Sequence, residues 1–532
     1  MSLILTAPLL FAASINEDDS AGAQLIRANC TGCHTPTNEG LSRISYQRKT
    51  PEGWEMTINR MRIVHGLKIN KAGIDVKGSG LHDMVKYLAD NQGLAPAETS
   101  GVRYLLEQNL NKIETQFDDE FTAMCARCHS GARVALQRRE EKEWNYLVDF
   151  HLGQFPSVEY SLLGRDRNWL GIARNKMVPL VAKNYPFTSD AWSAWSTSAK
   201  ASLSGAWILS GHMPGKGYFS ATMQVSAKEN KKDYYALTID GTYSNGDAIK
   251  GSGSAVVYTG YEWRGNIDFG DISLRQTLAA SSDGQTLTGR FYQKGQELVG
   301  MKITAIKDTD KTQLLSVSPS HIKQGQTATL TITGTGLTKI VTLPSSLTIN
   351  KVISQNANQQ IINVTAQNNA AIGYIDINAD NAILTKQLAI YQQVNALKVV
   401  PAYGISRVGG NGGSTPKSNT IFRAQGIDYG KDNIANTADD INLGYIEEVT
   451  WQVVPRDEIA KRDEDVKFAG KMNTQTGLFL PASAGPNPER FRSTNNAGNL
   501  NVIAKLKQNN KDITAVGRLL VTMQRWNNPP LK

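Results

Sequence analysis

The sequence predicts a multidomain protein of the α plus all-β class, with a helical N-terminal module followed by three domains built from β-strands. Three observations support this prediction. The chain has 532 residues, too many for a single hydrophobic core. Its first third carries an internal repeat with helical periodicity. The remainder consists of short runs of alternating apolar and polar residues, separated by Gly, Asn and Asp at turns.

The first residues have the pattern of an export signal. An apolar run from Leu3 to Ala13 ends in small residues before an acidic stretch, as the end of a secretory signal does. No positively charged residue precedes the run, so the pattern is incomplete and a frayed N-terminal segment is the alternative. We assign residues 1–19 to a signal or flexible arm.

Charge and hydropathy exclude two classes of function. The formal net charge is +9, but the basic residues are mixed with acidic ones and form no dense block. Nucleic-acid binding is therefore not expected, because no basic stripe interleaved with aromatic residues is present. No stretch of eighteen apolar residues follows the N-terminal segment, so the sequence predicts no transmembrane span.

The four cysteines all belong to two copies of the pattern C-x-x-C-H. This is the attachment motif of c-type haem, in which two thiols form thioether bonds to the haem and the adjacent histidine ligates the iron. A redox disulfide needs no adjacent histidine, and a zinc site would separate the two pairs by more than ninety residues, an unusual spacing. We expect two covalently bound haem c groups and therefore a periplasmic protein. The motif residues are Cys30, Cys33 and His34, and Cys125, Cys128 and His129.

The regions after the two motifs repeat each other. Residues 43–66 match residues 133–156 without a gap at an offset of 90 residues, and Trp54 meets Trp144 in this register. Two helical cytochrome-like modules in tandem explain the match. We place this domain at residues 20–187, with repeats at about 20–95 and 115–187.

The same register suggests the sixth iron ligands. It aligns Met61 with His151, and both residue types serve as distal haem ligands. We expect one haem to be ligated by His34 and Met61 and the other by His129 and His151, although Met61 could instead be a core methionine. The competitors for Met61 are Met56, His65, His82 and Met84.

Four arginines recur at equivalent positions after the two motifs. Guanidinium groups match the geometry of carboxylates, so haem propionates are candidate partners, with solvated surface positions as the alternative. These residues are Arg43, Arg48, Arg133 and Arg138.

Three β-domains are expected after the helical module. Strand patterns with Asn-Gly and Asp-Gly turns predict an antiparallel barrel or sandwich at residues 188–308. Residues 309–395 and 396–532 have the strand patterns of two immunoglobulin-like sandwiches. An acidic loop between Asp428 and Asp440 is a candidate calcium site, although it lacks the EF-hand spacing and an ordinary solvated turn is the alternative.

A tandem dihaem module followed by three β-domains resembles the alpha (dihaem cytochrome c) subunit of bacterial quinohemoprotein amine dehydrogenase. By architecture the resemblance spans the whole chain. It rests on CTGCH at residues 30–34, CARCH at residues 125–129 and the Trp…Met and Trp…His segments that follow them.

The resemblance implies an electron-transfer subunit of an oxidoreductase complex. It implies a β-propeller subunit and a small subunit carrying a tryptophylquinone, where primary amines are oxidised. Electrons would leave to a periplasmic copper protein or cytochrome c, and no catalytic residue is expected on this chain. A dihaem peroxidase, a generic dihaem electron carrier and a cytochrome attached to a surface by its β-domains are the alternatives.

Overall fold

The computed structural model describes residues 18–37, 40–76, 78–103, 111–155, 158, 167–411 and 415–523. The apolar run of the expected export signal lies outside these residues. The described chain forms two compact units. Their residues fall within Met1–Leu106, Ile113–Ala201 and Val257–Glu262 for the first unit, and within Glu107–Lys112, Ser202–Val256 and Trp263–Lys532 for the second. None of the described helices is both long and apolar enough to span a bilayer.

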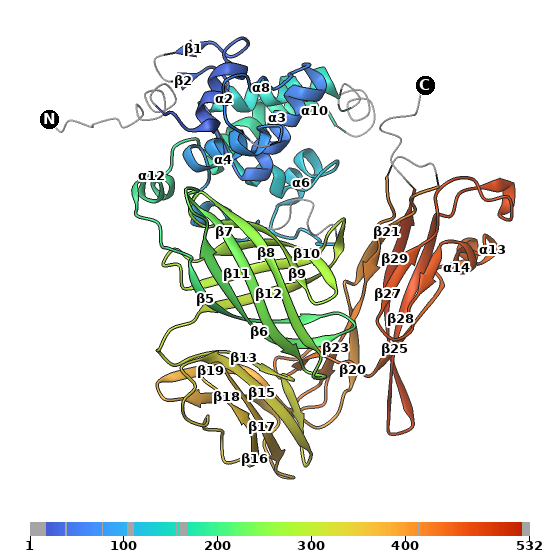
Figure 1. Cartoon of the computed structure of the whole chain (residues 1–532). Helices are drawn as coiled ribbons and strands as arrows, with labels where there is room; N and C mark the ends of the chain where they lie inside the picture. Colours follow the sequence, from blue (N-terminus) through green and yellow to red (C-terminus); the bar gives the residue numbers. More distant parts are fainter. Residues whose placement is uncertain are drawn as a thin grey trace. The chain divides into compact units, whose positions relative to one another are not determined.

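The first unit is helical, and its two sequence repeats form matching helices (Figure 1). Helix α3 spans Pro51–Val64 and helix α8 spans Glu141–Gln154, so both have 14 residues and begin at equivalent positions of the repeat. Thr50 caps α3 by accepting a hydrogen bond from the Gly53 N–H at 3.3 Å, and Pro51 follows where its missing N–H has no cost. The other elements are α2 (Ala21–Cys30), β1 (Pro36–Thr37), β2 (Gly40–Leu41), β3 (Gln47–Lys49), α4 (Leu81–Asn91), α5 (Pro96–Thr99), α6 (Asp119–Cys125), α7 (Ala132–Ala135), β4 (Gln137–Arg139), α10 (Trp169–Ile172), the π-helix η1 (Ala173–Met177), α11 (Val178–Asn184) and α12 (Asp190–Thr197).

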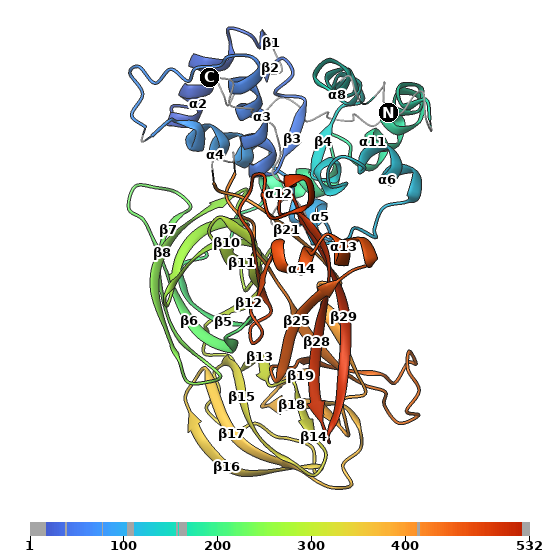
Figure 2. The ribbon, with the colours of Figure 1, turned by 90° about the vertical axis from the view of Figure 1, so that its right-hand side faces the viewer.

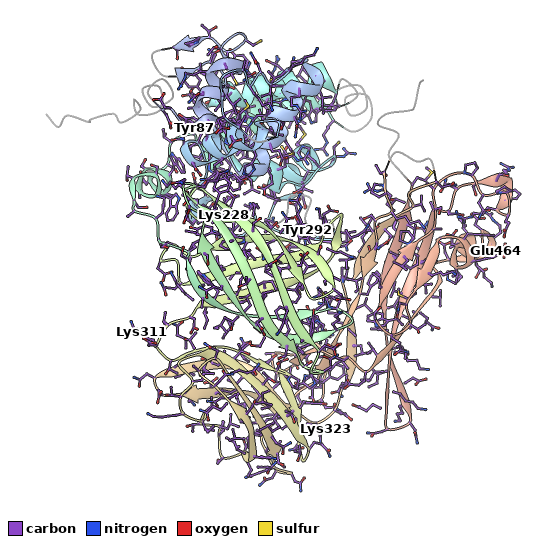
Figure 3. All side chains as sticks on the ribbon, viewed as in Figure 1. Tyr87, Lys228, Tyr292, Lys311, Lys323 and Glu464 are labelled. Carbon is purple, nitrogen blue, oxygen red and sulfur yellow. The ribbon has the colours of Figure 1, made fainter. Side chains whose placement is uncertain are left out.

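Helix α2, which ends at Cys30, is positioned by close packing against α4. Its apolar face, including Leu25 and Ile26, is completely buried. A Cβ atom added at Gly22 would lie 2.6 Å from the Cβ of Tyr87, a residue of α4 that Figure 3 labels. Only glycine therefore allows the two helix backbones to approach this closely, and the approach fixes where α2 delivers the first cysteine.

The two repeats are joined through equivalent strands. β3 pairs with β4 in antiparallel register, with Arg48 opposite Arg138. Figure 2 shows the two strands side by side, with α2, α3 and α4 on one side and α6, α8 and α11 on the other. Because alternate residues of a strand point to opposite faces, Arg48 and Arg138 share one face, and Lys49 and Arg139 share the other.

A closed barrel of eight strands begins the second part of the chain, in the strand order β10-β11-β12-β5-β6-β7-β8-β9. The barrel prediction is therefore confirmed. Gly246 and Gly284 of the expected hairpin turns have positive φ values of 93° and 68°. Residues 190–197, which the sequence analysis included in the barrel domain, instead form helix α12. The barrel strands are β5 (Gly205–Met213), β6 (Gly217–Ala227), β7 (Tyr234–Tyr243), β8 (Ala248–Tyr258), β9 (Glu262–Phe269), β10 (Ile272–Ala280), β11 (Thr286–Gln293) and β12 (Gln296–Lys307).

The next segment forms two small sheets around one core. Their strand orders are β13-β15-β17-β16 and β14-β19-β18. Leu330, Ile362 and Leu388 from the two sheets meet in the same apolar cluster. The strands are β13 (Gln313–Ser318), β14 (His321–Lys323), β15 (Thr327–Thr335), β16 (Leu347–Gln355), β17 (Gln359–Ala366), β18 (Gly373–Ala379) and β19 (Ala382–Tyr391).

The C-terminal segment contains three sheets, with strand orders β20-β23-β24, β21-β29-β28-β25 and β22-β27-β26. Phe422, Trp451 and Phe479 contribute to their common core. The immunoglobulin-like assignment of this segment and the preceding one stays a prediction. The elements are β20 (Ala396–Val400), β21 (Tyr403–Arg407), β22 (Thr420–Ile421), β23 (Arg423–Asp428), β24 (Ile441–Tyr445), β25 (Val449–Pro455), α13 (Glu458–Arg462), α14 (Asp465–Phe468), β26 (Gly470–Met472), β27 (Leu478–Pro481), the 3₁₀ helix η2 (Phe491–Ser493), β28 (Gly498–Gln508) and β29 (Lys511–Thr522).

Replacing Gly22 with alanine tests the packing of α2. We expect Gly22→Ala to lower the free energy of unfolding by about 1–3 kcal/mol, because the added methyl group overpacks the contact between α2 and α4. Gly153→Ala is the matched control, since Gly153 is also helical and has no atom within 4 Å of an added Cβ. The control should be neutral or stabilise by up to about 1 kcal/mol. Chemical denaturation measures both, and equal effects would contradict the account.

Candidate functional site

Each C-x-x-C-H motif follows the last turn of a helix. In the first motif, the N–H groups of Cys33 and His34 both donate to the carbonyl of Cys30, at 3.2 and 2.8 Å. This tight turn places two thiols and an imidazole on one short segment. The second motif starts in the same way, because α6 ends at Cys125.

The four cysteines form no disulfide, and two of them have raised pKa values. All four are free, and Cys33 and Cys128 are exposed. Burial, with a smaller contribution from Cys33, raises the pKa of Cys30 to about 12. Burial, with a smaller contribution from Asp118, likewise raises the pKa of Cys125 to about 12. Reactive cysteines have lowered pKa values instead. The described residues also contain no group of three or more His, Cys, Asp or Glu that could hold a metal ion.

The proximal histidines are held by one ring nitrogen each. The Nδ1 of His34 donates to the carbonyl of Ser42 at 2.8 Å, and the Nδ1 of His129 donates to the carbonyl of Ser130 at 2.9 Å. A carbonyl only accepts, so the proton lies on Nδ1 and leaves a lone pair on Nε2. In metal sites, the ring nitrogen that does not bind the metal commonly donates such a hydrogen bond, which orients the ligating histidine.

The structure brings His151 opposite His129. Their ring centroids lie 6.4 Å apart with the planes tilted by 44°. His151 also donates from Nδ1, to the carbonyl of Leu147 at 2.7 Å. Burial is the largest influence on both rings and lowers their pKa values, which favours the neutral, ligating form.

This spacing matches two imidazoles on opposite sides of one metal. A metal ion bonds an imidazole nitrogen at about 2 Å, which puts the two nitrogens about 4 Å apart and the ring centres about 6 Å apart. The residues present at the second motif therefore fit a haem iron held between His129 and His151.

Met61 lies at the repeat position equivalent to that of His151, but its role as an iron ligand has less structural support. It is half-buried on α3, at the place that His151 occupies on α8. Of its competitors, Met84 is completely buried in the core on α4, while His82 is exposed and its Nδ1 lies 3.2 Å from the hydroxyl of Tyr258. Met56 is half-buried on α3 and His65 is its exposed C-cap. The assignment of Met61 stays a prediction.

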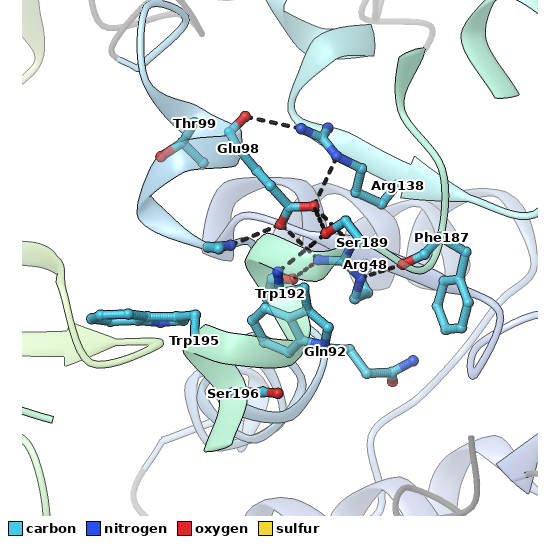
Figure 4. Close-up of polar contacts among 12 residues, drawn as sticks. Arg48, Gln92, Glu98, Thr99, Arg138, Phe187, Ser189, Trp192, Trp195 and Ser196 are labelled. Carbon is cyan, nitrogen blue, oxygen red and sulfur yellow. Dashed lines mark hydrogen bonds and ion pairs between the residues drawn. The ribbon is translucent and has the colours of Figure 1, made fainter. Parts of the chain in front are cut away.

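Two of the four predicted arginines have a partner that the sequence analysis missed. Arg48 donates to both carboxylate oxygens of Glu98, at 2.8 Å each. Arg138 donates to the same carboxylate at 3.1 Å and to the backbone carbonyl of Glu98 at 3.0 Å. Ser189 adds a further hydrogen bond at 2.8 Å, as Figure 4 shows. Arg48 and Arg138 thus bind an internal carboxylate, and a propionate contact for these two residues stays a prediction.

The Glu98 carboxylate is kept ionised despite its burial. Burial alone would raise the pKa of Glu98, but the hydrogen bonds and charges of Arg48 and Arg138 outweigh it and hold the pKa below its ordinary value. Burial lowers the pKa of Arg138, but a guanidinium begins from so high a value that it stays charged at neutral pH.

The other two predicted arginines differ in their surroundings. Arg43 pairs with Glu143 at 3.0 Å and lies 4.0 Å from the ring centre of Tyr146. Burial is the largest cause lowering the pKa of His129; the hydrogen bond to Ser130 opposes it, and the charge of Arg133 adds a smaller lowering effect. Neither observation tests the propionate expectation, which stays a prediction for Arg43 and Arg133.

The acidic loop of the C-terminal domain is a hydrogen-bonded turn. Asp428 is buried and accepts from the N–H groups of Gln392, Gln393 and Gly430. Asp439 accepts from the N–H of Lys431 at 2.7 Å. The carboxylates are thus used by the backbone, and no metal cluster occurs in the described residues. The calcium expectation is not supported.

Comparison with protein families matches nearly the whole chain. The matches are the haem-binding domain of the quinohemoprotein amine dehydrogenase alpha subunit at residues 20–192, its domain II at 200–308, its domain III at 311–392 and its domain IV at 397–531. Comparison with curated proteins gives no match.

Solved structures give only weak similarities. A redesigned β-barrel, mFAP1, bound to DFHBI is 20% identical, with a TM-score of 0.17, over 20% of this chain and 94% of that chain. A Bacteroides ovatus glucan-utilisation protein, SGBP-B, in complex with a mixed-linkage heptasaccharide is 12% identical, with a TM-score of 0.19, over 43% and 56%. Cadherin-like domains 1 to 4 of zebrafish RET are 12% identical, with a TM-score of 0.17, over 57% and 66%. These values support no argument about function.

Replacing Glu98 with glutamine tests the joint between the repeats. We expect Glu98→Gln to lower the free energy of unfolding by about 3–5 kcal/mol, because two buried guanidinium groups lose their counter-charge. Asp149→Asn is the control, since its pair with Arg174 is half-exposed and such pairs contribute at most about 1 kcal/mol. A loss for Glu98→Gln no larger than for the control would contradict the role of Glu98.

The lowered pKa of Glu98 also predicts a pH dependence. A carboxylate with a lowered pKa stabilises the fold above its unfolded pKa, about 4.3 for Glu. That stabilisation is lost as the pH falls through the lower folded value. The difference in unfolding free energy between wild type and Glu98→Gln should therefore shrink on acidification below about pH 4.3. A difference independent of pH would count against the ionised state of Glu98.

Proposed function

The chain belongs to the family of quinohemoprotein amine dehydrogenase alpha subunits, and from this we propose that it is the electron-transfer subunit of a periplasmic amine dehydrogenase. Its family match includes a haem-binding domain at residues 20–192. In our proposal, partner subunits oxidise primary amines and this chain carries the electrons away through two c-type haems. The observation that carries the proposal is the pairing of His129 with His151 beside a C-x-x-C-H motif.

We assign the haem groups to residues as follows. When bound, haem c supplies an iron centre that accepts and releases one electron at a time. Cys125 and Cys128 would tether the second haem, with His129 and His151 as axial ligands. The first haem would be held by Cys30, Cys33, His34 and Met61. The three histidines fix their own tautomer through backbone carbonyls, so the protein supplies pre-oriented ligands.

We propose a β-propeller subunit, a small subunit carrying a tryptophylquinone, and a copper protein or cytochrome c as the external acceptor. Outside the first unit, His212 is paired with Glu447 and His321 donates to the carbonyl of Leu443 at 2.6 Å.

A dihaem peroxidase is less well supported. A peroxidase needs an iron with an open or displaceable distal position. His151 is already placed across from His129 and is held by its own helix, which disfavours peroxide binding at the second haem.

Purification from the native host tests this function. We expect the chain to co-purify with a small polypeptide that stains for a quinone, and adding a primary amine without oxygen should reduce both haems. Absorption spectroscopy of the haem bands measures the reduction. A solitary chain whose haems are reduced only by unrelated donors would overturn the proposal, and peroxide turnover by the isolated chain would favour the peroxidase.

A further inference from the structure

The second face of the β3–β4 pair gathers buried positive charge around one carboxylate. We call the group of Arg43, Lys49, Arg60, Arg139 and Glu143 the cation face. Lys49, Arg139 and Glu143 are 2%, 4% and 4% exposed. Arg43 lies 3.0 Å and Arg139 3.9 Å from the Glu143 carboxylate. Two of the four cations, Arg43 and Arg139, thus pair directly with the single carboxylate of the group.

Lys49 and Arg139 also donate to neutral side chains. Lys49 donates to the Thr57 hydroxyl at 2.6 Å, and Arg139 donates to the side-chain oxygen of Gln137 at 2.8 Å. Burial and then the charges of Arg139 and Arg60 lower the pKa of Lys49 well below its ordinary value, against the opposing effect of Glu143. Burial is also the largest cause lowering the pKa of Arg139 to about 9. Buried charges are normally paired, and the single carboxylate of Glu143 does not balance the positive charge of the cation face.

Two buried hydrogen-bond donors also lack an acceptor. The Nε of Arg60 and the Nε1 of Trp144 are buried and have no hydrogen-bond partner among the described residues. The repeat equivalent of Trp144 behaves differently, because the Nε1 of Trp54 donates to the carbonyl of Gln92 at 3.0 Å. The guanidinium of Arg139 lies 5.5 Å from the ring centre of Trp144. Buried donors are rarely left unpaired in native proteins, so we expect a further acceptor for the Arg60 and Trp144 donors.

The cation face lies beside the expected iron ligand of the second haem. The guanidinium of Arg60 is 4.3 Å from the ring centre of Phe150, the residue before His151. Glu143 of the cation face lies on α8, the helix that carries His151. An anionic substituent of a group ligated by His151 would lie close to these cations.

We propose that the cation face binds a propionate carboxylate of the haem held by His129 and His151, and that its positive charge stabilises the ferrous state of that haem. This inference rests on the proposed function. Reduction adds one electron and lowers the charge of the haem by one, so a nearby cation repels the oxidised form more strongly than the reduced form. Arg60 and Arg139 are positioning residues in this scheme, and they raise the midpoint potential of the second haem.

The test is a redox titration of the assembled holoprotein. We expect Arg139→Gln to keep both haems and to lower the midpoint potential of the haem with two histidine ligands more than that of the other haem. Arg60→Gln should shift the same haem in the same direction, and it carries the test if Arg139→Gln fails to assemble. Arg139→Lys should restore most of the wild-type potential, because it restores the charge.

Arg174→Gln is the matched control. It removes the same formal charge from the same helical unit, but its pair with Asp149 is half-exposed and therefore screened by solvent. Its potentials should stay at the wild-type values. If both haems are present and neither Arg139→Gln nor Arg60→Gln shifts the second haem beyond the control, the inference is overturned. Failure of the amine to reduce the wild-type haems would instead count against the proposed function.

Discussion

A buried carboxylate, Glu98, connects the two halves of the helical unit because the arginines that the repeat duplicated both converge on it. Arg48 and Arg138 face each other across the β3–β4 pair and donate to the same side chain. The internal repeat alone would place two similar modules next to each other without fixing their relation. The shared carboxylate, which lies between the repeats in sequence, fixes that relation by making both modules depend on one counter-charge.

The pairing of β3 with β4 also determines which charged residues lie on the opposite face of the two strands. Because neighbouring residues of a strand point to opposite faces, Lys49 and Arg139 lie on the face opposite to Arg48 and Arg138. There Arg139 and Arg43 pair with Glu143, a residue of the helix that also carries His151. The β3–β4 pair thus separates two ion clusters. On one face Glu98 balances the charges of Arg48 and Arg138, and on the other face the cation face carries excess positive charge beside the expected haem ligand. The tertiary structure therefore places positive charge beside the proposed haem site.

The sequence was sufficient for features with local or periodic signals. The offset of 90 residues predicts two matching helices, and α3 and α8 begin and end at equivalent residues. The Asn-Gly and Asp-Gly turns predict hairpins of the barrel. The partners of the arginines could not be predicted, because Glu98 is 40 to 50 residues away from them in sequence. Choosing Arg139 rather than Arg138 as the residue facing the second motif also required the strand register, which a three-residue strand does not reveal in advance.

The central prediction is that one helical unit holds two haem irons with different distal ligands. Electron paramagnetic resonance of the oxidised, purified holoprotein tests this, because it distinguishes low-spin haems by their axial ligands. The account predicts two low-spin signals per chain, one from a haem with two histidine ligands and one from a haem with a histidine and a methionine. The His151→Ala variant should lose the first signal and keep the second. A single haem per chain, or a high-spin signal from the second motif in the wild-type protein, would contradict the account.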